Sequence, residues 1–342
     1  MNERYTVIIP EHNRPDHLKR LLDYFLSFNL KIIVADSSNV EFKYLDEFYD
    51  KIIYKFYPKV GLADKLYKIL PLIDTPYVVM CANDDFLVPQ AIEDIISYLE
   101  IHKEYNSGQG IYTDFTPLED SISCSVRYKN TMDIDLNNEL PSQRLLTLQG
   151  NYFQYYYSVF RKSSFSEVVS SVIVDGSSVI KNLCLLESYI SSYTAIDGKH
   201  IIIPSFYSAR ENIEDSAASH TDTIPVIIKK KKYKKEYLNY LDLLSKTLAS
   251  KENLNTNVAN DIVIESVSIY VKQIYPDFFT IKGKTKYYIK EFLKEIGVAS
   301  FLRNYRYKEL KEVSGFPADL KGKEHWDKIK LIIQKYDYLY KK

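Results

Sequence analysis

The sequence predicts an α/β protein: a mostly parallel sheet with flanking helices, followed by an α-helical C-terminal domain. In the N-terminal third, short apolar runs typical of buried strands alternate with segments of helical periodicity. Polar and acidic residues collect where these runs end, as they do at the ligand crevice of an open parallel sheet. After about residue 225 the apolar residues recur mainly with helical spacing. The sequence therefore places a ligand site before residue 225.

The first strands and helices follow from the apolar pattern. Residues 5–9 read as a strand, and Pro15, a residue suited to the first turn of a helix, opens the next element. Residues 31–35 are a second buried strand and residues 51–56 a third, after which Gly61 precedes a second helix. The inner faces of the two helices consist of Leu18, Leu21, Leu22, Phe25 and Leu26, and of Leu62, Leu66, Ile69 and Leu70.

The fourth strand leads directly into two adjacent carboxylates. Residues 78–81 are apolar on both faces, which suits the centre of a parallel sheet. Asp84 and Asp85 follow at its carboxyl end, and Pro89 then opens a helix. Two adjacent carboxylates repel each other unless a cation or hydrogen-bond donors compensate. Either the pair holds a divalent metal that bridges a diphosphate, or it caps the following helix.

The C-terminal third is predicted to be helical. Helical stretches are expected near residues 237–244, 263–274, 286–295 and 326–340. We therefore expect an α/β domain over residues 1–224 and an α-helical domain over residues 225–342. The lysine-rich run at 229–235 is either a solvated start of a helix or a surface for anionic lipid headgroups.

Composition excludes several classes of protein. The chain has 45 Lys and Arg against 45 Asp and Glu, and a net charge of zero argues against general nucleic-acid binding. No apolar stretch reaches the length of a membrane span. Three cysteines at unrelated spacings suit reduced residues of a cytoplasmic protein. Because no Gly-rich phosphate-binding motif occurs among its ten glycines, dinucleotide-binding and P-loop enzymes are disfavoured.

Three motifs at strand ends resemble those of the family 2 glycosyltransferases of the GT-A fold. They are Pro10-Glu11-His12-Asn13-Arg14 after the first strand, Asp36-Ser37-Ser38 after the second, and Asn83-Asp84-Asp85 after the fourth. Lys65 stands where the family has a basic residue near the diphosphate. Ala82 departs from the family pattern, which has an acid at that position. The resemblance extends over about residues 4–222.

The resemblance implies a nucleoside diphosphate sugar as donor, UDP-linked, with Mg²⁺ or Mn²⁺ as cofactor. It implies that Asp84 and Asp85 hold the metal, with His220 either a further ligand or a solvated residue of a polar loop. Arg210 is either a diphosphate contact on a loop or a surface residue. The residues implied in nucleotide-sugar binding are Pro10, Glu11, His12, Asn13, Arg14, Asp36, Ser37, Lys65, Asn83, Asp84 and Arg210.

Further along the chain, the similarity continues through a helix around residues 185–189 and a strand over residues 201–204. In the family this helix carries the catalytic base, and Glu187 is the matching acid. An inverting transfer needs a carboxylate that takes the proton from the acceptor hydroxyl as it attacks the sugar. The alternative is that Glu187 is an ordinary exposed helix residue.

We therefore expect a glycosyltransferase of surface-polysaccharide synthesis that acts on a glycan or lipid-linked glycan, in the cytoplasm or on the inner face of the membrane. The C-terminal helices would bind the acceptor, pair subunits or contact the membrane. One alternative is a sugar nucleotidyltransferase, although residues 10–13 lack the glycines expected there. Another is a non-catalytic scaffold on the same fold, which the missing acid at Ala82 keeps open.

Overall fold

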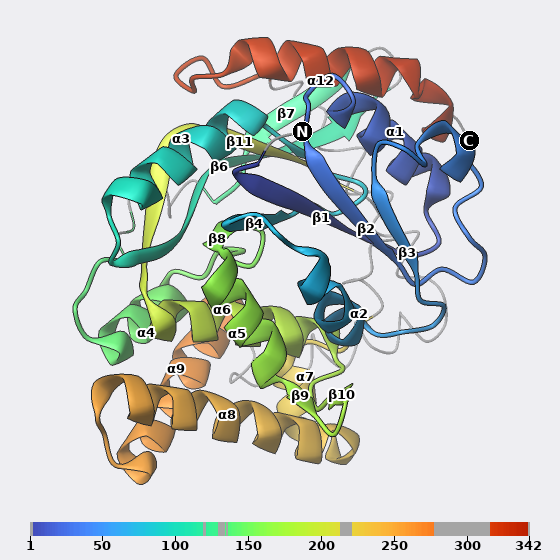
Figure 1. Ribbon diagram of the computed structural model, residues 1–342. Coiled ribbons are helices and arrows are strands. Elements are labelled where there is room, and N and C mark those ends of the chain that lie inside the picture. The colour runs from blue at the N-terminus through green and yellow to red at the C-terminus, as the bar shows by residue number, and fades with distance from the viewer. Residues whose placement is uncertain are drawn as a thin grey trace.

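The computed structural model describes residues 3–118, 121–128, 134, 136–212, 221–276 and 315–340. Its centre is a nine-stranded sheet with strand order β3-β2-β1-β4-β8-β6-β11-β5, in which β7 pairs with β6 (Figure 1). The strands are β1 (Tyr5–Glu11), β2 (Lys31–Asp36), β3 (Ile53–Phe56), β4 (Tyr77–Met80), β5 (Phe86–Leu87), β6 (Tyr105–Pro117), β7 (Ile122–Val126), β8 (Val159–Arg161) and β11 (Lys199–Glu211). A separate hairpin consists of β9 (Ile173–Val174) and β10 (Ser177–Ser178).

The first four strands form the parallel part of the sheet, as the sequence predicts. β1 lies between β2 and β4, and β3 lies beyond β2, with every one of these pairs parallel. Nearly all residues of β1, β2 and β4 are buried, because helices cover the sheet, and this explains their continuous apolar runs. Parallel strands end at the same edge, and Glu11 at the end of β1 is in register with Asp36 at the end of β2.

The other half of the sheet differs from a purely parallel arrangement. β8 runs antiparallel between β4 and β6, and the long strands β6 and β11 are parallel to each other. The strand predicted at 201–204 lies in the first half of β11, which continues to Glu211. Arg210 therefore lies in a strand and not in a loop. Because the end of β11 pairs antiparallel with β5, it lies beside the segment that follows Asp85.

Helices cover both faces of the sheet (Figure 1). In that view α12, α1 and α3 lie above the sheet, while α4, α5 and α6 lie below it. The α-helices before residue 225 are α1 (Pro15–Phe25), α2 (Leu62–Ile69), α3 (Pro89–Ile101), α4 (Pro141–Gly150), α5 (Lys162–Ser171) and α6 (Leu183–Asp197). Short 3-10 turns are η1 (Leu45–Glu47) and η2 (Leu70–Leu72). Proline occupies the first turn of α1, α3 and α4, where a missing N–H costs no hydrogen bond.

The helices of the C-terminal region pack in two different places. α7 (Ile224–Lys229) and η5 (Lys231–Tyr233) lead into α8 (Lys234–Glu252) and α9 (Thr256–Ile274), which pack on each other and on α6 and α4. Asn253 ends α8 in the left-handed conformation, and Asn255 caps α9. In contrast, α12 (Lys323–Lys335) packs on α1, at the opposite end of the molecule, and is followed by η7 (Asp337–Leu339) (Figure 1).

Helices are thus present where the sequence predicts them near 237–244, 263–274 and 326–340, while the predicted helix at 286–295 lies outside the described residues. None of the helices in the described ranges is long and apolar enough to cross a membrane.

Candidate active site

The loops that follow β1 and β2 are joined by hydrogen bonds. Asn13 adopts a φ of 56°, which asparagine tolerates better than most residues. Its backbone N–H donates to Ser38 Oγ at 2.7 Å, and its side-chain oxygen accepts from the N–H of Asn39 at 3.0 Å. His12 Nδ1 lies 3.1 Å from the carbonyl oxygen of Ser37. Two motifs that are distant in the sequence therefore form one surface at the edge of the sheet.

Asp36 is held below this surface, with only 1% of its area exposed. Its Oδ2 accepts a hydrogen bond from the Tyr54 hydroxyl at 2.6 Å, and its Oδ1 accepts from the N–H of Ser38 at 2.7 Å. Tyr54, on β3, is a partner that the sequence did not single out, because nothing local links it to Asp36. Each carboxylate oxygen can accept two hydrogen bonds, so both oxygens keep accepting capacity for a ligand.

Lys65 and Glu11 are both buried beneath the two loops. The Lys65 amine donates to the carbonyl oxygen of Glu11 at 2.7 Å and to Ser37 Oγ at 3.0 Å. The Glu11 carboxylate accepts from the N–H of Arg14 at 2.6 Å and from Asn83 Nδ2 at 2.5 Å. Burial lowers the pKa of Lys65 to about 8 and raises the pKa of Glu11 to about 7. The Lys65 and Asn83 side chains therefore hold the loops after β1 and β2 in place through hydrogen bonds to Glu11 and Ser37.

The adjacent carboxylates after β4 each pair with an arginine. Arg14 Nη1 donates to Asp84 Oδ2 at 2.6 Å, and Arg210 Nε donates to Asp85 Oδ2 at 3.0 Å. The N–H of Glu211 donates to Asp85 Oδ1 at 3.1 Å. Burial is the largest influence on Asp85 and raises its pKa to about 7, while Arg210 opposes the rise. The repulsion between the two carboxylates is thus compensated by arginines from β11 and from the loop after β1.

A fully buried arginine supports this segment from α1. Arg20 donates from Nη2 to the carbonyl oxygen of Asp84 and from Nη1 to Glu211 Oε2, both at 2.7 Å. It also donates to the hydroxyl of Tyr340, which comes from the end of the described chain. Arg20, Glu211 and Tyr340 were not predicted as part of the site. A single arginine beside an apolar helix face gives no periodic signal, and its partners lie as far as 320 positions away.

The residues at this edge suit a hard divalent cation if a ligand supplies further oxygens. Mg²⁺ is usually held by one or two carboxylates together with substrate phosphates and water. Asp84 and Asp85 offer that number of carboxylates. Within the described residues no group of three or more His, Cys, Asp or Glu side chains converges as a metal site. His220, the proposed further ligand, lies outside the described residues.

Glu187 lies on α6, which Asn182 caps by accepting a hydrogen bond from the N–H of Leu185 at 3.1 Å. The hydroxyl of Tyr156 donates to Glu187 Oε1 at 2.9 Å. Burial raises the pKa of Glu187 above its ordinary value, and Tyr156 and the charge of Arg210 oppose this rise. Arg210 also pairs with Asp85, so its positive charge acts on the carboxylates of both Asp85 and Glu187.

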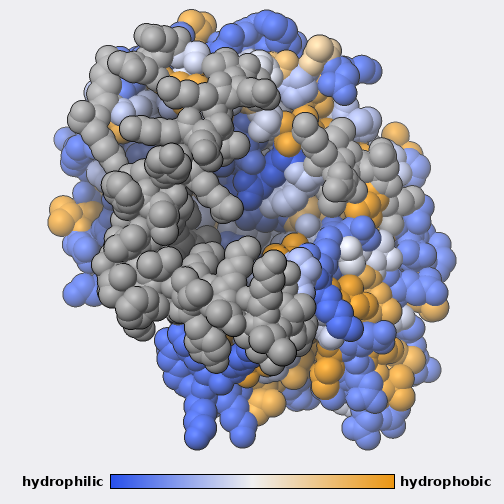
Figure 2. Space-filling view, turned by 180° about the vertical axis from the view of Figure 1, so that it is seen from behind, coloured by the Kyte–Doolittle hydropathy of each residue, from blue (hydrophilic) through white to orange (hydrophobic). Residues whose placement is uncertain are grey.

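A cavity of about 250 Å³ borders Glu187. We call it the Glu187 cavity; it is lined by Tyr128, Tyr152, Gln154, Cys184, Glu187, Tyr270 and Ile274. The Tyr152 and Tyr270 rings meet edge to face, with centroids 4.8 Å apart. Figure 2, a view from behind, shows a surface that is hollowed near its centre, with hydrophilic residues in the coloured part of the hollow.

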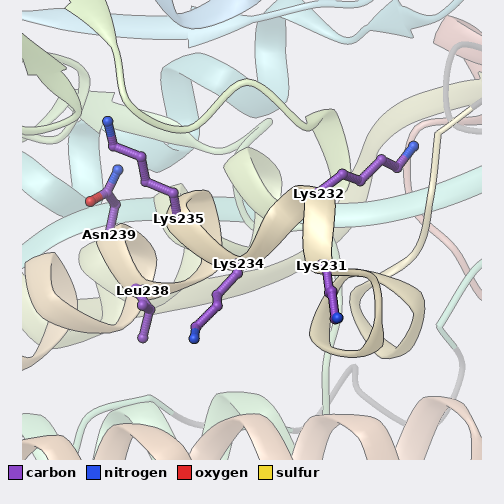
Figure 3. Close-up of a pocket in the computed structure, with 6 residues that line it drawn as sticks. All are labelled: Lys231, Lys232, Lys234, Lys235, Leu238 and Asn239. Atoms are coloured by element: carbon purple, nitrogen blue, oxygen red, sulfur yellow. The ribbon is translucent and has the colours of Figure 1, made fainter.

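A second depression, of about 450 Å³, lies at the start of α8. It is lined by Lys231, Lys232, Lys234, Lys235, Leu238 and Asn239. The lysine side chains extend in different directions in Figure 3, so their amines do not converge on one point. Lys232 already pairs with Asp222, at 3.2 Å. This arrangement is that of a solvated helix start, and we assign no ligand to it.

Most of the residues singled out from the sequence lie at the edge formed by the ends of β1, β2 and β4. Pro10 lies opposite Ala35 in the register of β1 and β2. The residues gathered there are Pro10, Glu11, His12, Asn13, Arg14, Asp36, Ser37, Lys65, Asn83, Asp84, Asp85 and Arg210.

Comparison with known proteins gives a family and a fold. Residues 6–168 match the model of glycosyl transferase family 2. No curated protein sequence matches the chain. The crystal structure of S. aureus TarS 1-349 superposes with a TM-score of 0.54 at 10% identity, covering 82% of this chain and 75% of that chain. TarS 1-349 in complex with UDP-GlcNAc gives a TM-score of 0.53 at 12% identity, covering 82% and 76%. At such identities the structural likeness concerns the fold.

Proposed function

We propose that the chain transfers the sugar of a UDP-linked donor to a hydroxyl of a glycan acceptor, with inversion. Its similarity to the family 2 glycosyltransferases of the GT-A fold supports this, because residues 6–168 match the model of that family and the fold is similar to that of TarS. The observation that carries this proposal is the edge where β1, β2 and β4 end, since it joins Asp36, the Asp84–Asp85 pair and two arginines. The similar fold of S. aureus TarS, crystallised with UDP-GlcNAc, supports UDP as the nucleotide. Surface-polysaccharide assembly, in the cytoplasm or on the inner membrane face, is the setting that we propose.

The base of the nucleotide would bind at Asp36. A uracil ring offers an N–H donor, and the Asp36 carboxylate keeps unused acceptor capacity beside its bonds to Tyr54 and Ser38. The loops of His12 and Asn13 would form the rest of the nucleotide surface.

The diphosphate would lie over Asp84 and Asp85. Arg14 and Arg210 lie beside these carboxylates and could pair with phosphate oxygens, which planar guanidinium groups bind well. When bound, Mg²⁺ or Mn²⁺ at Asp84 and Asp85 would neutralise negative charge that builds on the departing diphosphate. Preorganised positive charge at the leaving group is a large contribution to catalysis of this kind.

Glu187 would act as the general base. Its carboxylate would take the proton of the acceptor hydroxyl while the acceptor oxygen forms a bond to the anomeric carbon and the bond to the diphosphate oxygen breaks. The electron pair of that broken bond leaves with the nucleoside diphosphate. A base pKa near the working pH favours such proton transfer, and burial moves the pKa of Glu187 in that direction.

Thermal melting with UDP, GDP and CDP, each with and without Mn²⁺, tests the donor site. We expect UDP to raise the melting temperature most, and more with Mn²⁺. Asp36→Asn keeps the shape of the side chain but turns an acceptor into a donor, so UDP should bind about tenfold more weakly. Asp50→Asn, at an exposed position, serves as the control and should bind UDP as the wild type does. Equal UDP affinity in wild type and Asp36→Asn would contradict the assignment of the base site.

A further inference from the structure

The Glu187 cavity is built by segments from four parts of the chain, one of which is Tyr128 after β7. Cys184 and Glu187 come from α6, Tyr152 and Gln154 from the stretch after α4, and Tyr270 and Ile274 from the last turns of α9. α9 belongs to the helical region beyond residue 225, and it packs on α4 and α8. The helical region therefore supplies one wall of a cavity whose other wall holds the proposed catalytic base.

The described residues that line this cavity are mostly aromatic or polar. The tyrosine rings offer apolar faces, and Gln154 Oε1 is a strong acceptor. This oxygen is shielded from water and has no hydrogen-bond partner among the described residues. A buried acceptor without a partner is costly, so a ligand hydroxyl that donates to it would relieve that cost. None of the described residues that line the cavity is a lysine or arginine.

From this arrangement we propose that the Glu187 cavity is the acceptor subsite, that it takes one uncharged sugar unit, and that Tyr270 and Ile274 of α9 select this unit. The inference rests on the proposed function and specifies its acceptor. A sugar ring presents C–H groups that pack on tyrosine faces and hydroxyls that can donate to Gln154 and Glu187. The volume of about 250 Å³ is below the roughly 300–1,000 Å³ of pockets for drug-sized ligands, which suits a single sugar unit.

The charge of the described lining residues also disfavours one kind of acceptor unit. A phosphate-bearing unit would meet the Glu187 carboxylate inside the cavity, and none of the lining residues that the structure describes is a lysine or arginine. Desolvating an anion next to a carboxylate is unfavourable. A neutral unit avoids this cost and leaves Glu187 free to accept a proton from its hydroxyl.

Filling the cavity tests the proposal. Ile274 is 40% exposed at the end of α9, so Ile274→Trp adds bulk at the cavity without disturbing a buried core. The matched control is Ile264→Trp on the same helix, at a residue that is 46% exposed and does not line the cavity. Ligand-observed NMR with UDP present would measure binding of uncharged methyl glycosides, with glycerol 3-phosphate as the anionic probe.

We expect wild type and Ile264→Trp to bind a methyl glycoside and Ile274→Trp to lose that binding, while all three keep the same UDP affinity. Gln154→Leu should weaken glycoside binding by about tenfold, because it removes the acceptor and keeps the volume. Glycoside binding that survives in Ile274→Trp, or a preference for glycerol 3-phosphate in the wild type, would overturn the acceptor assignment. If neither the wild type nor any variant binds UDP, that result would instead overturn the proposed function.

Discussion

Replacing Glu187 by glutamine should lower the turnover rate while leaving the affinity for UDP nearly unchanged. Glutamine has the same shape, and its side-chain oxygen can still accept the 2.9 Å hydrogen bond from the Tyr156 hydroxyl. It cannot accept a proton from the acceptor. Loss of a general base costs roughly 10²–10⁴-fold in rate, which corresponds to about 3–5 kcal/mol in the barrier. Since Glu187 borders the cavity and the proposed nucleotide site is at the ends of β1, β2 and β4, UDP affinity should stay within about twofold of wild type.

The pH dependence gives an independent check of the same role. Burial raises the pKa of Glu187 above its ordinary value, so wild-type turnover should fall as the pH drops through that raised pKa. Glu187→Gln should lack this acidic limb. Tyr156→Phe should shift the limb to higher pH, because the Tyr156 hydroxyl normally lowers the pKa of Glu187.

The assay is release of UDP during transfer to an acceptor glycoside, with UDP affinity measured by calorimetry. Glu167→Gln, at an exposed position of α5, is the matched control and should leave both quantities unchanged. Turnover of Glu187→Gln within tenfold of wild type would refute the base assignment. Reduced UDP affinity with normal turnover would make Glu187 a binding residue. The next acids along the chain, Asp197 and Glu211, are paired with Lys251 and Arg20, so each lacks the position of Glu187 in the cavity.

Three other perturbations test the surroundings of the donor site. Asp85→Asn should abolish the Mn²⁺-dependent part of the UDP-induced melting shift and leave the metal-independent part, as thermal melting would show. Burial raises the pKa of Glu11 from 4.5 to about 7, so its favourable contribution to stability is complete below pH 4.5 and is lost as the pH rises through 7. Glu11→Gln should therefore flatten the fall in unfolding free energy between pH 4.5 and 7 by about 3 kcal/mol, measured by urea unfolding. Tyr340→Phe removes the hydroxyl bonded to buried Arg20 and should lower that free energy by about 1.5–3 kcal/mol.

Each of these predictions has a result that would contradict it. A Mn²⁺ response that persists in Asp85→Asn would move the metal elsewhere. Parallel pH profiles for wild type and Glu11→Gln would mean that Glu11 does not titrate in this range. For Tyr340→Phe the control is Tyr338→Phe, at a residue that is 52% exposed, and equal stability of the two variants would show that the hydroxyl of Tyr340 contributes nothing to the network.

The parallel half of the sheet, and the edge where the residues proposed for the donor site gather, could be predicted from the sequence. Strands and helices repeat with short periods, so local apolar patterns identify β1, α1, β2 and β4 within a few residues. Parallel strands end at one edge, and this rule alone brings Glu11, Asp36 and Asp85 to the same side. Glu187 was singled out only through resemblance, since an acid in a helix has no local signal of catalysis, and its role as base stays a prediction.

Only the tertiary structure determines which partners those side chains contact. Asp36 pairs with Tyr54, Lys65 points beneath the loops, and Arg20 joins Asp84 to Tyr340, although these partners are 18 to 320 positions apart in the chain. The antiparallel insertion of β8 and the extension of β11 place Arg210 beside Asp85, and α9 closes the Glu187 cavity. The physical reason is that strand and helix formation depend on neighbours within a few residues, whereas ion pairs, cavities and pKa values depend on groups that only folding brings within a few ångströms.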